Sequence, residues 1–251
     1  MLTKQKISRI AADAALNIEN IIFPLFFLYF AVLNLILASS GFPAALKIFA
    51  KMKDQNFTVP DVRFISAVLT ELLLFFCDIL VAWSLIIRRN LYKKAEGALE
   101  ILLPIIGTCF FLLYNLFPRL PQTWNVILMP KGLLMACSVF GTLVAAAGLI
   151  ISIVATYHLR YSYGVLIQVR NVITTGLYRY VRHPIYFGYI LFAFGLVILN
   201  PTLGYIVFSI VFVYVTTLRA VIEERKLALF CEEYRSYIES TPFIFPFKFN
   251  R

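Results

Sequence analysis

The chain has 251 residues, of which 61% are hydrophobic and only 14% are charged. About 25% of the residues in a soluble domain are usually charged, so this composition excludes an ordinary soluble protein. The formal net charge of +10 does not indicate a nucleic-acid partner, because the basic residues cluster between apolar runs, which favours contact with anionic lipid.

The apolar residues form runs that are long enough, or nearly so, to cross about 30 Å of hydrocarbon. These runs occupy residues 21–38, 64–87, 101–117, 132–156, 185–199 and 203–222. The sequence therefore predicts an all-α, polytopic membrane helix bundle of about six transmembrane helices, with no room for a separate soluble domain.

The segment after the first run, residues 43–53, alternates apolar and basic residues with a helical period. This pattern predicts an amphipathic helix that lies in the membrane interface. In the second run Glu71 and Asp78 are seven residues apart and share one helix face. Acids inside a membrane are often functional, so this pair either makes a polar contact within the bundle or lines a cavity.

Small residues recur every four positions in the fourth run, at Cys137, Gly141 and Ala145, with Gly148 nearby. This stripe predicts that a neighbouring helix approaches closely. The chain has 4 Cys residues, and they form no Cys/His cluster or Cys-x-x-Cys pair. We therefore expect neither a disulfide framework nor a metal site.

The fifth run is short for a full crossing, and only Asn200, Pro201 and Thr202 join it to the sixth. The two runs are expected to form a tight antiparallel hairpin, with the fifth either spanning the membrane or tilted and half-buried. After the sixth run, helical periodicity continues from Glu223 to Ile238. This predicts an amphipathic cytoplasmic helix that continues the sixth span.

Most of the 23 Lys and Arg residues lie at the N-terminus, after the second and fourth runs, and after the sixth run. The positive-inside rule then predicts an integral membrane protein with both termini in the cytoplasm. The basic N-terminus has no small-residue cleavage site, so we interpret it as a retained segment and not a signal peptide. The same count places the 172–188 loop and the Glu223-Glu224 pair together on the cytoplasmic face.

The densest group of functional side chains is the segment V-I-T-T-G-L-Y-R-Y-V-R-H-P-I-Y-F-G, residues 172–188. Pro184 suits the first position of a helix, and it disfavours helical backbone at His183. Arg182 and His183 would then lie at a helix N-terminus, where an anion is favoured. The alternative interpretation is an interfacial loop whose Arg and Tyr side chains anchor to lipid headgroups.

The pattern G-x-Y-x-x-x-R-H-P-x-Y-x-G in this loop resembles the signature of the isoprenylcysteine carboxyl methyltransferase and phospholipid methyltransferase superfamily. The second half of that signature is also present, as Glu223-Glu224, Phe230-Cys231, Tyr234, Tyr237 and Pro242. Cys231 replaces the family's Gly. The resemblance covers roughly residues 157–246, so we divide the chain into N-terminal transmembrane helices at 1–156 and a methyltransferase-like region at 157–251, within one structural domain.

The resemblance implies an integral membrane enzyme that uses S-adenosylmethionine. Its cofactor-binding residues carry over as Arg182, His183, Pro184, Tyr186, Glu223 and Glu224. A Glu carboxylate can accept the ribose hydroxyls, Arg182 and His183 can hold the cofactor carboxylate, and Tyr178 or Tyr186 can face the sulfonium or the adenine.

Arg219 precedes Glu224 by five residues, which matches the family's Arg-x4-Glu, so the resemblance implies that Arg219 and Glu224 are catalytic. The alternative for Arg219 is an ordinary i,i+4 ion pair with Glu223. The leading methyl acceptor is the carboxylate of a prenylated cysteine, and a phospholipid amine is the alternative. A protein of another class, which binds a lipid or partner without catalysis, would share the fold.

Overall fold

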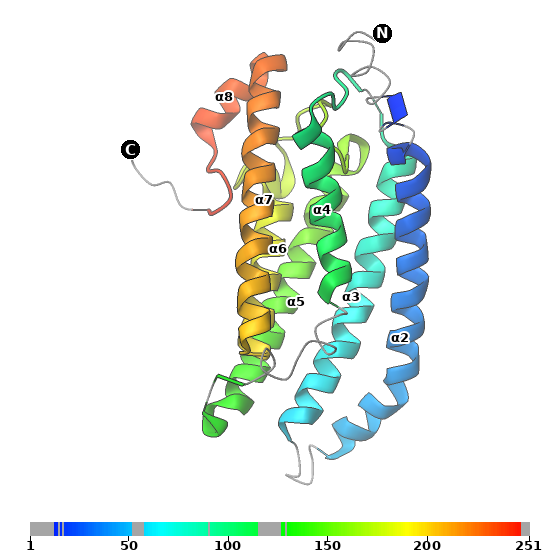
Figure 1. Cartoon of the computed structure of the whole chain (residues 1–251), viewed down its shortest axis with the longest axis vertical. Helices are drawn as coiled ribbons and strands as arrows, with labels where there is room; N and C mark the ends of the chain where they lie inside the picture. Colours follow the sequence, from blue (N-terminus) through cyan, green and yellow to red (C-terminus); the bar gives the residue numbers. More distant parts are fainter. Residues whose placement is uncertain are drawn as a thin grey trace, which may run out of the picture.

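The computed structural model describes residues 13, 14, 16, 18–51, 58–89, 91–114, 127, 128 and 130–246. Within them the chain is helical, with no strand, as Figure 1 shows. The long helices are α2 (Phe23–Lys51), α3 (Val59–Ile87), α4 (Ala98–Tyr114), α5 (Leu134–Leu159), α6 (Pro184–Leu199) and α7 (Leu203–Phe230). The shorter elements are η1 (Ile18–Ile22), η5 (Lys131–Leu133), η6 (Arg160–Ser162), η7 (Gly176–Arg179) and α8 (Glu232–Ser240).

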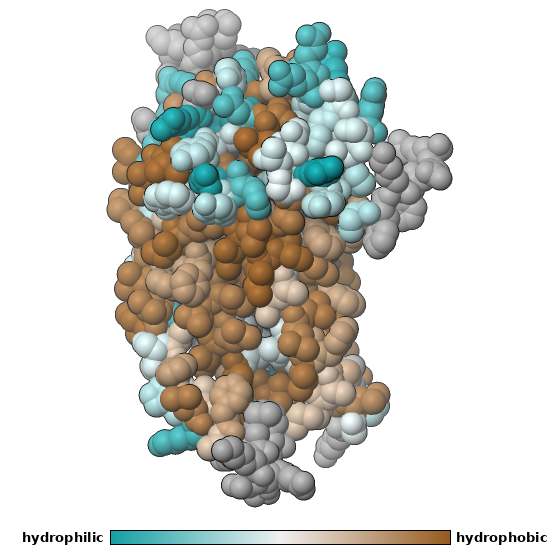
Figure 2. Space-filling model, turned by 180° about the vertical axis from the view of Figure 1, so that it is seen from behind, coloured by the Kyte–Doolittle hydropathy of each residue, from teal (hydrophilic) through white to brown (hydrophobic). Residues whose placement is uncertain are grey.

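The helices confirm an all-α membrane bundle. Among the described residues, 4 helices are long and apolar enough to cross a membrane, and they contain α2, α3, α5 and α7. The α4 segment Ala98–Thr108 and α6 are shorter apolar helices. On the face that Figure 2 draws, a broad apolar band crosses the middle of the molecule, and most of the hydrophilic residues lie toward one end. These features describe an integral membrane protein.

The segment after the first apolar run differs from its prediction. Residues 43–51 are the last turns of α2 and not a separate interfacial helix. Pro43 lies inside α2, and Figure 1 shows the helix bending toward its lower end, as expected where a proline removes a backbone hydrogen bond. Gly41 allows α3 to pack closely here, because an added Cβ would lie 2.7 Å from Cγ2 of Val68.

The small-residue stripe of α5 packs against α6, as predicted. A Cβ added to Gly148 would lie 2.5 Å from the carbonyl oxygen of Gly188, and one added to Gly195 would lie 2.7 Å from Cα of Ala145. Backbones this close require residues without larger side chains. Because α6 has 16 residues, its length is roughly 24 Å, less than the hydrocarbon thickness of about 30 Å.

The α6–α7 hairpin is present, and Thr202 caps α7 by accepting a hydrogen bond from the Tyr205 amide at 3.5 Å. The end of α7 differs from the prediction of one continuous helix. The helix stops at Phe230, and α8 begins at Glu232 as a separate amphipathic helix. Tyr234 and Tyr237 of α8 are buried, whereas Glu232 and Glu233 are exposed.

The helices pack in sequence around the bundle: α2 against α3, α3 against α5, α5 against α6, and α6 against α7, which also contacts α4. The α8 helix and the 160–183 segment lie at the same end of the molecule in Figure 1. The two half-motifs therefore share one face of the bundle, as predicted. The assignment of that face to the cytoplasm stays a prediction.

Candidate functional site

The centre of the candidate site is an ion pair between the two half-motifs. Arg182, just before α6, donates from Nε to Oε1 of Glu224 at 2.5 Å and from Nη2 to Oε2 at 3.1 Å. Glu224 belongs to α7 and follows Arg182 by 42 residues. This bidentate arrangement is geometrically specific and holds the loop firmly against α7.

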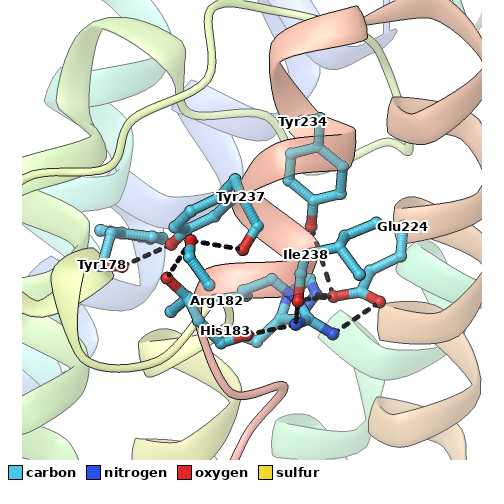
Figure 3. A network of polar contacts seen from close by, with 9 residues as sticks. Tyr178, Arg182, His183, Glu224, Tyr234, Tyr237 and Ile238 are labelled. Atoms are coloured by element: carbon cyan, nitrogen blue, oxygen red, sulfur yellow. Dashed lines mark hydrogen bonds and ion pairs between the residues drawn. The ribbon is translucent and has the colours of Figure 1, made fainter.

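The remaining bonds of Arg182 hold the chain after α8. Its Nη1 donates to the carbonyl oxygen of Ile238 at 2.9 Å and to that of Thr241, and Figure 3 shows the guanidinium between Glu224 and this segment. The backbone amides of Arg182 and His183 donate to the carbonyls of Pro242 and Phe243 at 2.9 and 3.1 Å. Because every nitrogen of the guanidinium has a protein partner, Arg182 has little donor capacity left.

His183 is buried beside the same carboxylate. Its Nε2 lies 3.2 Å from Oε1 of Glu224, and its ring stacks on Tyr186 with centroids 5.3 Å apart and an interplanar angle of 12°. Phe243 packs against the His183 ring in an edge-to-face arrangement, with centroids 5.2 Å apart. Pro184 begins α6, as the sequence predicted, and is fully buried.

The second Glu of the pair takes a different partner. Tyr186 donates from its hydroxyl to Oε2 of Glu223 at 2.7 Å. Arg219 lies over the Tyr186 ring, with Cζ 5.3 Å from the centroid, and its Nη2 donates to the Val165 carbonyl oxygen at 2.6 Å. Nε of Arg219 is buried with no hydrogen-bond partner. Among the described residues no ion pair within 4 Å joins Arg219 to Glu223, so the i,i+4 pair is not formed.

Tyrosines surround this network. Tyr237 donates to the carbonyl oxygen of Tyr178, and Tyr234 donates to Oε1 of Glu224 at 3.4 Å, as Figure 3 shows. Burial raises the pKa of Tyr237 to about 12, with the Glu224 charge acting in the same direction and Arg182 opposing it. Burial also raises the pKa of Tyr178 well above its ordinary value. Both hydroxyls therefore stay protonated and remain donors at neutral pH.

Gly176, the first glycine of the loop motif, has a φ of +63°. This left-handed conformation is open to glycine at little cost. A Cβ at this position would also collide with the imidazole of His158 on α5. The glycine therefore lets the loop turn against the end of α5, and Tyr178 in η7 lies within hydrogen-bond distance of Tyr237.

A cavity of about 190 Å³ begins at this network and extends into the bundle. Of the residues predicted for the site, Tyr178, Arg182, His183, Tyr186, Arg219 and Glu223 line it. Pro184 and Glu224 lie behind this lining. The opposite walls come from α2, α3 and α4, through residues such as Phe30, Leu74 and Thr108. The N-terminal helices, which carry no recognised motif, thus form a large part of the cavity.

Sequence reasoning missed Glu19. Its side chain is fully buried, and Oε1 accepts the amides of Val165 and Leu166 at 2.7 and 3.0 Å and lies 2.9 Å from Nη1 of Arg88. Glu19 therefore holds the segment whose Val165 carbonyl binds Arg219. In the sequence, Glu19 is visible only as an acidic residue just before an apolar run. Nothing in the sequence pairs it with residue 165.

The part of the chain that carries this geometry also matches a known family. The model of the phospholipid methyltransferase family matches residues 136–230, from α5 to the end of α7. This region is therefore similar to the phospholipid methyltransferases. The match confirms the resemblance to the superfamily, although it begins earlier than the 157 expected from the motifs and ends before α8. No curated protein matches the chain.

The matched region contains α5, α6 and α7, together with Arg182, His183, Arg219 and both Glu residues of the network. The α2, α3 and α4 walls of the cavity lie outside it. Among the described residues, no group of three or more His, Cys, Asp or Glu side chains is arranged to hold a metal ion.

Proposed function

We propose that the chain transfers the methyl group of S-adenosylmethionine to a lipophilic acceptor. One observation carries the proposal: the two half-motifs meet in a buried network at the end of a cavity whose other walls are apolar membrane helices. Such a cavity can receive a polar cofactor at one end and a lipid chain at the other. The family match to membrane methyltransferases supports the same reaction class.

The residues at the polar end fit the cofactor. Among the described residues, Tyr186 is the hydrogen-bond partner of Glu223, through Oε2, which leaves Oε1 open to ribose hydroxyls. The faces of Tyr178 and Tyr186 suit a sulfonium or an adenine ring. When bound, S-adenosylmethionine would supply an electrophilic methyl group.

Arg182 and Glu224 mainly position other residues of the site. Arg182 has a protein partner on each nitrogen, and both Glu224 oxygens accept its bonds. We therefore assign Glu224 the role of holding Arg182 and His183 in place, more than direct proton transfer. His183, which lines the cavity, remains available to the cofactor carboxylate.

A prenylcysteine carboxylate is the acceptor that Arg219 favours. A buried guanidinium with an unpartnered Nε is complementary to an anion. A carboxylate is already ionised at neutral pH and needs no strong base. The protein would then contribute in-line positioning and exclusion of water.

A phospholipid amine is the second candidate, and the description of the matching family favours it. An amine must lose a proton before or during transfer, so a carboxylate in the cavity would have to accept it. Glu223 and Asp78 both line the cavity and are the available groups.

The test is calorimetry of the purified protein in detergent with S-adenosylmethionine and with its demethylated product. Labelled methyl transfer to prenylcysteine and aminophospholipid acceptors is then measured on the same samples. We expect cofactor binding and transfer to one acceptor class. Lipid binding without any cofactor binding would instead favour the non-catalytic protein.

The site assignment predicts a loss of cofactor affinity in Glu223→Gln and His183→Ala. Each substitution removes a charge-assisted bond to the cofactor, worth roughly 1–3 kcal/mol. Calorimetry measures the change, and Glu232→Gln on the exposed face of α8 serves as the control. Unchanged affinity in both cavity variants would remove the paired half-motifs from the cofactor site.

A further inference from the structure

The cavity contains a second polar group, in the N-terminal helices. Asn34 of α2 and Asp78 of α3 both line it, and Nδ2 of Asn34 donates to Oδ2 of Asp78 at 2.9 Å. Asp78 precedes the end of α3 at Ile87 by a distance of roughly 14 Å along the helix. The pair therefore lies within the apolar part of the bundle, near the cavity walls formed by Phe30 and Leu74.

The hydrogen bond to Asn34 does not by itself explain why a carboxyl group occupies position 78. A carboxylate in a membrane helix is costly, and an apolar pair would pack two helices without that cost. An ionised carboxylate has about four acceptor positions, of which Asn34 uses one. Among the described residues Asn34 is its hydrogen-bond partner. The unused acceptor positions of a cavity-lining carboxylate suit a ligand that donates hydrogen bonds.

The same cavity is also lined by Arg219, whose guanidinium is complementary to an anion. Tyr163 lines the cavity together with Arg219 and Asp78. A molecule that carries an anionic group and a hydrogen-bond-donating nitrogen would complement the Arg219 guanidinium and the Asp78 carboxyl group together.

We propose that Asn34 and Asp78 form a subsite for an N–H group of the acceptor, which is therefore a lipid with an anionic group and an N–H donor in its polar part. The subsite rests on the proposed function, because it defines the acceptor of that reaction. A prenylcysteine has this chemistry in its carboxylate and amide, and an aminophospholipid has it in its phosphate and ammonium.

The experiment compares lipids that differ in the N–H donor. N-acetyl-S-farnesylcysteine is paired with S-farnesylthiopropionic acid, which lacks the acetylamino group, and phosphatidylethanolamine is paired with phosphatidylcholine. Equilibrium binding of each lipid is measured by titration in detergent, for the wild type and for Asp78→Asn. We expect Asp78→Asn to weaken binding of the N–H lipid by roughly tenfold, the scale of a hydrogen bond to a charged group, and to leave its partner unchanged.

Glu71→Gln is the matched control, because Glu71 is on the same helix but does not line the cavity. We expect it to keep the wild-type preference. The pair of lipids that responds to Asp78→Asn identifies the source of the N–H group. Three results would overturn the subsite. The first two are that Asp78→Asn weakens binding of both lipids in each pair equally, or changes the binding of neither. The third is that Glu71→Gln weakens binding as much as Asp78→Asn does.

Cofactor titrations on the same samples separate this result from the proposed function. If S-adenosylmethionine does not bind the wild type, the methyltransferase proposal fails. The lipid titrations still decide the subsite, because they need no turnover. If the cofactor binds equally to wild type and Asp78→Asn while the lipid preference is lost, both proposals are supported.

Discussion

At the scale of single residues, the site depends on how the two arginines are partnered. The guanidinium of Arg182 bonds to Glu224 and to two carbonyls of the C-terminal segment. Arg219 bonds to one carbonyl, stacks on Tyr186, and keeps a buried Nε without a partner. An arginine whose donors are used supports the structure, whereas one with an open donor in a cavity can hold a ligand.

Arg219→Lys should therefore separate acceptor handling from cofactor binding. Lysine keeps the charge but loses the planar fork that aligns a carboxylate. If the acceptor is a prenylcysteine, we expect turnover to fall on the order of a hundredfold, as for a modest misplacement, with little change in cofactor affinity. Calorimetry and methyl transfer measure the two effects.

Arg225→Lys, an exposed position on the same helix, is the control for this substitution. Full activity of Arg219→Lys on a prenylcysteine would exclude Arg219 from the site. Equal losses in cofactor affinity and turnover would place it at the cofactor instead.

At the scale of elements, close packing of α5 and α6 positions the start of α6, where His183 and Pro184 lie. Gly188 faces α5 so closely that an added Cβ would lie 2.5 Å from the Gly148 carbonyl oxygen. A substitution here should therefore affect both stability and cofactor binding.

Gly188→Ala should lower the stability of the bundle by roughly 1–3 kcal/mol, the usual cost of overpacking. Thermal unfolding in detergent measures the loss. Gly132→Ala is the matched control, because no atom lies within 4 Å of a Cβ built there. Equal melting temperatures for the two variants would contradict the close approach of the helices.

Glu19 of η1 holds the segment between α5 and η7 in position. Glu19→Ala leaves the Val165 and Leu166 amides without their acceptor and Arg88 without its carboxylate partner. We expect a loss of roughly 3–5 kcal/mol, as when one member of a buried ion pair is removed. Glu19→Gln should cost less, since its amide oxygen still accepts both hydrogen bonds.

Thermal unfolding distinguishes these two Glu19 variants. Asp13→Ala is the control, because Asp13 pairs with Lys94 on the exposed surface, where an ion pair contributes about 0–1 kcal/mol. If Glu19→Ala is as stable as Asp13→Ala, Glu19 does not anchor the segment.

At the scale of the whole molecule, one end of the bundle carries the site, and the charge distribution predicts that this end is cytoplasmic. The backbone of Lys93 pairs with that of Val169, so the 91–97 segment and the segment before the loop motif belong to the same end. Thr202, between α6 and α7, pairs with Ile127 at the other end.

Single cysteines at Lys93, Tyr180 and the exposed Leu203, in a chain without its native Cys residues, test this topology. A reagent that cannot cross the membrane should label positions 93 and 180 from the cytoplasm and position 203 from the opposite side. Labelling of 93 and 180 from different sides would contradict a single site. Labelling of both from outside would invert the predicted orientation.

The sequence by itself determined the features that depend on local pattern. Long apolar runs predict membrane helices wherever they occur, the four-residue spacing of Gly141, Ala145 and Cys137 predicts a close helix contact, and Pro184 marks a helix start. The half-motifs also indicated the resemblance to the methyltransferase superfamily, because the signature places several residue types within a short stretch, and the family model matches residues 136–230.

The tertiary structure alone decided which distant residues become partners. Asn34 and Asp78 are 44 residues apart, and Glu19 and Val165 are 146 residues apart, and no local pattern links them. The same holds for Arg182, which the family resemblance made a cofactor ligand and which the structure engages with Glu224 and the C-terminal segment. The physical reason is that a buried polar group needs a hydrogen-bond partner, and that partner is a residue that helix packing places beside it. Helix packing depends on the whole chain and not on the local sequence.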